Sequence, residues 1–152
     1  MRGCLCLLAM VAGGLALQGC SESVPAAEGA WGPAENGVRA MLCSPRAAWT
    51  LGQAVEVRVR LRNAKGEFVD FQSSADLELT ITRGDERVAE DMDYVTLAEK
   101  GIRLSPGEII EFPLRSYPTG ESAGKLSKGS GGYRFAGRLA GLELPPLDLR
   151  VE

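Results

Sequence analysis

Very few side chains of this sequence could carry covalent chemistry. The 152 residues include no histidine and four cysteines, which are Cys4, Cys6, Cys20 and Cys43. Without histidine the chain has no Ser–His or Cys–His pair that could activate a nucleophile. Too few soft ligands remain to complete a zinc site. The absence of histidine therefore excludes catalysis by Ser–His and Cys–His pairs and argues against a zinc site.

Carboxylates are the other groups with catalytic potential. A glycosidase sets its two acids in a cleft lined with aromatic residues, whereas the acids here fall on outward strand positions and in loops. The acidic stretch Asp85–Asp93 lacks the spacing of a calcium loop and indicates a solvated edge. We therefore expect a protein that is not an enzyme and that holds no metal or cofactor.

The first twenty residues have the pattern of a processed leader. Arg2 precedes the apolar run CLCLLAMVAGGLAL over Cys4–Leu17, which suits a signal peptide and is shorter than the ~20 residues of a spanning helix. Small Gly19 and branched Leu17 suit a peptidase that cuts before Cys20. The tetrapeptide LQGC at 17–20 resembles the lipobox of bacterial lipoproteins, whose cysteine is acylated on sulfur.

This resemblance implies that residues 1–19 are a signal peptide, that cleavage occurs between Gly19 and Cys20, and that Cys20 is lipidated. Several acyl chains, at about 0.8 kcal/mol per buried methylene, hold a protein stably on a membrane. The alternative is an ordinary secretory signal with a chance cysteine. Ser21, which follows the cysteine, resembles an outer-membrane sorting signal. The expected location is the cell envelope, anchored to the outer membrane and facing the periplasm.

The charge of residues 21–152 limits the kinds of partner that this part of the chain could bind. Residues 21–152 hold all 20 acidic residues and 16 of the 17 basic ones (all but Arg2), which gives a formal charge of −4. This balance offers no footprint for nucleic acid and no polybasic patch for an anionic membrane surface. We expect the partners to be the membrane, through the lipid, and another envelope or secreted protein. Cys43 lies in a predicted strand, which indicates a buried thiol; an intermolecular disulfide or redox role is the alternative.

Residues 20–37 are small, polar and interrupted by proline, which predicts a lipidated cysteine followed by a flexible tether. From Val38 onward the apolar residues recur with a period of two, as half-buried antiparallel strands require. Turn signals separate these segments, Pro145-Pro146 among them. The pattern predicts an all-β fold, an immunoglobulin-like antiparallel β-sandwich of about seven to nine strands over residues 38–152. The predicted strands are 38–43, 54–62, 68–72, 76–83, 87–89, 94–98, 108–115, 133–139 and 147–152.

Several local motifs of the predicted sandwich resemble those of a known protein family. Tyr133, just before a strand, resembles a tyrosine corner, in which the phenol ties an interstrand turn to backbone upstream. The order of four elements resembles the bacterial immunoglobulin-like domains typified by the BsuPI-type proteinase inhibitor. The resemblance implies the fold and, as an alternative function, inhibition of a periplasmic proteinase, but it transfers no inhibitory contact residue. The elements are Trp49–Gly52, Phe71–Ser74, Leu104–Glu108 and Gly132–Leu139.

The strand 54–62 places Arg58, Arg60 and Arg62 in a row on one face. Two interpretations are open for this row. The arginines form ordinary ion pairs with acids on neighbouring strands, such as Glu111, or they form a basic strip for an acidic partner. These three arginines are the candidate partner-binding residues. The leading hypothesis is a non-catalytic, lipid-anchored envelope protein whose sandwich is a protein-binding or structural module.

Overall fold

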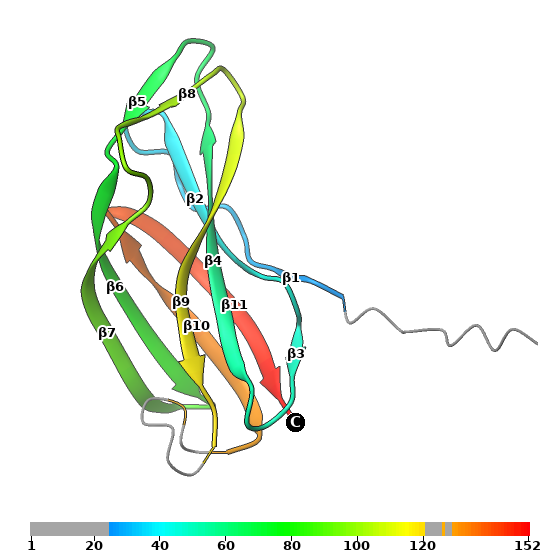
Figure 1. Ribbon diagram of the computed structural model, residues 1–152. Helices are drawn as coiled ribbons and strands as arrows, with labels where there is room; N and C mark the ends of the chain where they lie inside the picture. Colours follow the sequence, from blue (N-terminus) through cyan, green and yellow to red (C-terminus); the bar gives the residue numbers. More distant parts are fainter. Residues whose placement is uncertain (1–24, 121–125, 127–128) are drawn as a thin grey trace, which may run out of the picture.

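The structure is a computed structural model that describes residues 25–120, 126 and 129–152. In this part of the chain there are eleven strands and no helix, so no helix there could span a membrane. Two sheets pack face to face (Figure 1), which confirms the predicted β-sandwich. The strand number exceeds the prediction because three strands of only two or three residues were not predicted: Ala27–Glu28, Ala48–Trp49 and Ile102–Leu104.

The four-stranded sheet has the order β1-β2-β4-β9, formed by Ala27–Glu28, Val38–Ser44, Ala54–Asn63 and Ile109–Pro118. The five-stranded sheet has the order β3-β11-β10-β6-β7, formed by Ala48–Trp49, Leu142–Val151, Gly131–Leu139, Ser74–Arg83 and Glu86–Thr96. A two-stranded sheet of β5 (Val69–Phe71) and β8 (Ile102–Leu104) lies at one end of the sandwich. We call this the β5–β8 end. The chain's C-terminus lies toward the opposite end (Figure 1).

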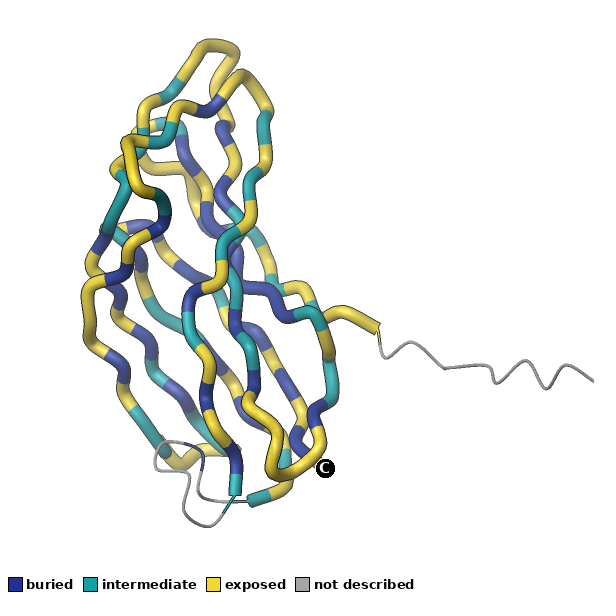
Figure 2. The backbone as a smooth tube through the Cα atoms, viewed as in Figure 1, coloured by how far each residue is buried: buried dark blue, intermediate teal, exposed yellow. Residues whose placement is uncertain are grey.

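The core lies between the two sheets and follows the predicted alternation. The inward residues of β4 are Val55, Val57, Val59 and Leu61, and each is at most 1% exposed. Buried and exposed residues alternate along the strands (Figure 2), as the pleat requires. Each aliphatic side chain buried in this way stabilises the fold by roughly 1.5–3 kcal/mol. On the facing sheet, the core includes Leu77, Leu79, Ile81, Tyr133, Phe135, Leu147 and Leu149.

The predicted tyrosine corner is present. The hydroxyl of Tyr133 donates a hydrogen bond to the carbonyl of Gly129, four residues upstream, at 2.6 Å. The orders β2-β4-β9 and β11-β10-β6 correspond to strands A-B-E and G-F-C of an immunoglobulin domain, with β7 in the C′ position. Pairing is antiparallel apart from β3, which runs parallel to β11.

The predicted gap between strands 87–89 and 94–98 is wrong, because residues 86–96 form the single strand β7. The acidic residues between them had indicated a solvated edge, and β7 is the outermost strand of its sheet among the described residues. An edge strand tolerates charge because one of its sides faces solvent. Asp91 is the exception, since its side chain points into the sandwich and is buried.

Pro145-Pro146 does not form the predicted turn and lies within β11. The partners of Phe135 and Gly137 on β11 are Leu147 and Leu144, so the two prolines face the single residue Ala136. This β-bulge accommodates prolines within a paired strand because it interrupts the ladder where they lack N–H donors.

Part of the predicted tether belongs to the sandwich. Ala27–Glu28 pairs with β2, and the amides of Gly29 and Gly32 donate to the carbonyls of Leu42 and Ala40, each at 2.9 Å. The segment then turns into β2 through a two-residue hairpin. Its central residues, Asn36 and Gly37, have φ of 51° and 85°, which is the type I′ geometry that Asn-Gly favours. The domain therefore extends to at least Pro25. The signal peptide, the cleavage site at Gly19 and the lipidation site at Cys20 lie outside the described residues.

Candidate functional site

The arginine row lies on the outer face of the β1-β2-β4-β9 sheet, and two of its members are paired with acids. Glu111 of β9 accepts hydrogen bonds from Arg58 at 2.9 Å and from Arg60 at 2.7 Å. Arg58 also donates to Glu56 at 2.6 Å, and Arg60 donates to Glu28 on β1. Hydrogen bonds from the two guanidinium groups hold the pKa of Glu111 below its ordinary value. The charges of Arg58 and Arg60 are thus compensated within the domain.

Beneath these ion pairs lies the free thiol. Cys43 points to the outer face of β2, opposite Arg58 in register, yet it is only 2% exposed. Burial, together with the nearby negative charge of Glu111, raises the pKa of Cys43 to about 11. The thiol is therefore buried, as predicted, and protonated at neutral pH.

Arg62, the third member of the row, has a different environment. It lies directly opposite Arg39 of β2, and its neighbour on β9 is Ile109. Both arginines are exposed, and among the described residues neither has a carboxylate within ion-pair distance. A surface hollow of about 260 Å³ is lined by Arg39, Arg62 and Ala64. Arg39 could not be predicted as part of the row, because it comes from another strand and only the register brings it there.

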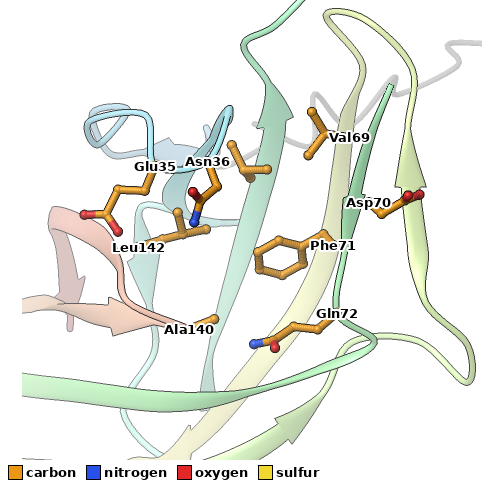
Figure 3. Close-up of a pocket in the computed structure, with 9 residues that line it drawn as sticks. Glu35, Asn36, Val69, Asp70, Phe71, Gln72, Ala140 and Leu142 are labelled. Atoms are coloured by element: carbon orange, nitrogen blue, oxygen red, sulfur yellow. The ribbon is translucent and has the colours of Figure 1, made fainter. Parts of the chain in front are cut away.

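A pocket of about 220 Å³ lies nearby, at the β5–β8 end (Figure 3). Side chains from the hairpin at 35–38, from β5 and from the turn between β10 and β11 converge around it. That second turn is also tight, because Ala140 and Gly141 have φ of 50° and 81°. The lining residues are Glu35, Asn36, Val38, Val69, Asp70, Phe71, Gln72, Ala140 and Leu142.

The shape and chemistry of this pocket limit what it could hold. Sites for drug-sized ligands measure about 300–1,000 Å³, so a volume of about 220 Å³ suits a single side chain. Its wall combines the ring of Phe71 and buried Leu142 with the amides of Asn36 and Gln72 (Figure 3). Phe68, next to β5, is 57% exposed and packs against the guanidinium of Arg103, 5.0 Å from the ring centroid.

A buried asparagine makes this end rigid. The amide of Asn63 is fully buried and donates to the carbonyls of Glu67 and Leu104 at 2.7 and 3.1 Å. Its carbonyl oxygen accepts a hydrogen bond from the backbone amide of Lys65 at 2.8 Å. Asn63 thus ties the end of β4 to the segments that flank β5 and β8. The bond to Leu104 spans 41 residues of the chain, so residue spacing in the sequence does not reveal it.

The described residues contain no group of three or more side chains arranged to hold a metal ion. The most buried acid, Asp91, accepts hydrogen bonds from Tyr117 at 2.9 Å and from Arg115 at 3.2 Å. It lies in the interface between the two sheets and away from the pocket at the β5–β8 end. This arrangement links the sheets, and we assign it a structural role.

Comparison with known proteins adds little to these observations. No protein-family model matches the chain, and no curated sequence matches it. Among solved structures, the chain is similar to the alkylpurine DNA glycosylase AlkC of Pseudomonas fluorescens bound to DNA containing an abasic site analog. The TM-score is 0.43 and the identity 12%, and the match covers 85% of this chain and 31% of the glycosylase chain. The chain thus spans about a third of that protein.

Proposed function

We propose that this protein is a non-catalytic, lipid-anchored component of the cell envelope and that its sandwich binds another protein. The motif LQGC at 17–20 supports the anchor, with cleavage before Cys20, and Ser21 supports the outer membrane. The observation that carries the binding function is the pocket at the β5–β8 end, which has room for about one side chain and is built from tight turns.

Protein interfaces draw most of their affinity from a few side chains that enter well-formed pockets. The pocket meets this requirement without rearrangement, because hairpins and the buried Asn63 hold its walls. Exposed apolar side chains lie at the same end, with Phe68 57% and Ile109 51% exposed. A protein that fills the pocket would also cover these two apolar side chains.

The pocket can be tested by filling it. Gln72 lines the pocket and is exposed, so Gln72→Trp places an indole over the opening without disturbing the core. The matched control is Gln53→Trp, because Gln53 is also exposed and lies in the turn between β3 and β4, far from the pocket. Both full-length variants are expressed in the native envelope, crosslinked and compared with the unmodified protein.

We expect one or more crosslinked proteins to disappear with Gln72→Trp and to persist with Gln53→Trp. Identical crosslinks from all three proteins would contradict a binding role for the pocket. If the protein that is lost is a proteinase, its activity in the presence of each variant tests the inhibitor alternative directly.

A further inference from the structure

We infer that Arg39 and Arg62 form a carboxylate-binding site, and that the protein partner presents an acidic segment to it. This inference rests on the proposed function and names the chemistry of the partner. It starts from a difference between neighbouring rows of one sheet face.

In one row, Met41, Arg60 and Glu111 lie side by side on β2, β4 and β9, and the positive charge meets its acid. In the next row, Arg39, Arg62 and Ile109 occupy the same three strands. Two positive charges face each other there, and an exposed apolar side chain takes the place of the acid. Directly opposed like charges destabilise a sheet, so the second row lacks the structural benefit of the first.

The geometry of the pair suits a carboxylate. Directly opposite residues of antiparallel strands have Cβ atoms about 4.5–5.5 Å apart, so both guanidinium groups can reach one anion. Arginine presents its donors in a planar fork that matches the two oxygens of a carboxylate. The hollow of about 260 Å³ between Arg39, Arg62 and Ala64 leaves room for such a group. Strands β2 and β4 hold the two arginines in a fixed relation.

An acidic protein segment fits this site better than an anionic lipid surface does. Recognition of an anionic membrane surface takes a cluster of about four to eight basic residues, whereas this site has two arginines. The chain beyond Cys20 carries a formal charge of −4, which opposes approach to an anionic surface. Ile109, 51% exposed beside Arg62, adds an apolar contact that a protein partner can cover.

The site can be probed with a fluorescently labelled glutamate decapeptide and the full-length protein in neutral detergent micelles. The test variant is Arg39→Gln with Arg62→Gln. The matched control is Arg134→Gln with Arg138→Gln, which removes the same charge from the outer face of β10. There Arg134 already pairs with Asp148 at 2.8 Å, and Arg138 lies between Glu78 and Glu143 in register.

We expect the test variant to weaken peptide binding about tenfold or more and the control to change it by about twofold or less. Binding to the unmodified protein should also weaken as salt is added, since the pair is exposed. Equal losses in the two variants, or no binding of the peptide at all, would overturn the inference. A response to phosphatidylglycerol vesicles that requires Arg39 and Arg62, without peptide binding, would assign the site to lipid and also overturn it. These outcomes concern only Arg39 and Arg62. The proposed function is tested separately, by the crosslinking experiment with Gln72→Trp.

Discussion

The hydroxyl of Tyr117 on β9 donates a hydrogen bond of 2.9 Å to the carboxylate of Asp91 on β7, so the outer strands of the two sheets are joined across the core. Asp91 is 5% exposed and also accepts from Arg115 at 3.2 Å. Burial, reinforced by the charge of Asp91, raises the pKa of Tyr117. The ring of Tyr117 lies 5.5 Å from that of Phe135. A charged group is tolerated in this interface because several donors satisfy it.

Tyr117→Phe should lower the free energy of unfolding by about 1–3 kcal/mol, because it removes a donor from the buried carboxylate. The matched control is Tyr94→Phe, which deletes an exposed hydroxyl bonded to Ser74 and should change stability by no more than about 0.5 kcal/mol. Urea unfolding of both variants measures the difference. Equal losses of unfolding free energy in the two variants would mean that the hydrogen bond between the sheets stabilises the fold no more than an exposed one does.

Stability should fall at high pH. The pKa values of Cys43, Tyr117 and Tyr133 are all raised in the folded state, chiefly by burial, so folding disfavours their charged forms. For Cys43 the stabilising contribution is complete below its ordinary pKa of 9.0 and is lost as the pH rises through about 11.

The melting temperature should therefore decrease from about pH 9 upward, and Cys43→Ala should flatten part of this decrease between about pH 9 and 11. Melting curves from pH 7 to 11 check both statements. A Cys43→Ala profile parallel to that of the unmodified protein would show that the thiol does not contribute.

Arg62→Gln should stabilise the domain by about 0.2–1 kcal/mol, because it relieves the repulsion from Arg39 across β2 and β4. The gain should shrink as salt is added. Arg60→Gln, two residues away on the same face, should have the opposite sign, because it leaves Glu111 and Glu28 without one of their donors. Chemical unfolding at low and high salt measures both changes. A loss of stability with Arg62→Gln would contradict the like-charge assignment.

Gly32→Ala should detach the N-terminal segment from the sandwich. A Cβ at this position would lie 2.3 Å from the carbonyl oxygen of Glu143, which is backbone and cannot move aside cheaply. Hydrogen exchange should accelerate at the amides of Gly29 and Gly32, which bond to β2. The control is Gly66→Ala, where an added Cβ meets nothing within 4 Å. Unchanged protection in Gly32→Ala would mean that the segment is not held against β11.

Cys20→Ala should release a folded domain from the membrane fraction, because the lipid proposed on that sulfur would be lost. Fractionation of cells followed by a melting curve of the released protein checks location and folding together. A variant that remained in the membrane fraction would contradict the anchor.

The alternation of apolar residues determined much of the fold. Val55, Val57, Val59 and Leu61 face the core as predicted, because the pleat sends successive side chains to opposite faces. The tyrosine corner was also predictable, since Tyr133 bonds to a carbonyl only four residues away. Such features depend on neighbours in the chain and are visible in the sequence.

The pairing of strands decided which side chains become neighbours, because the alternation of apolar residues along one strand does not specify its contacts with other strands. Arg58, Arg60 and Arg62 are equivalent in the sequence, yet Glu111 compensates the first two while Arg62 faces Arg39. The same applies to the buried carboxylate of Asp91, whose partner Tyr117 is 26 residues away. Charges and hydrogen bonds act over a few ångströms in space, so their outcome depends on register and sheet packing. The sequence by itself determined the sandwich, because alternation is local to each strand, while the tertiary structure decided which arginines have an acidic partner among the described residues.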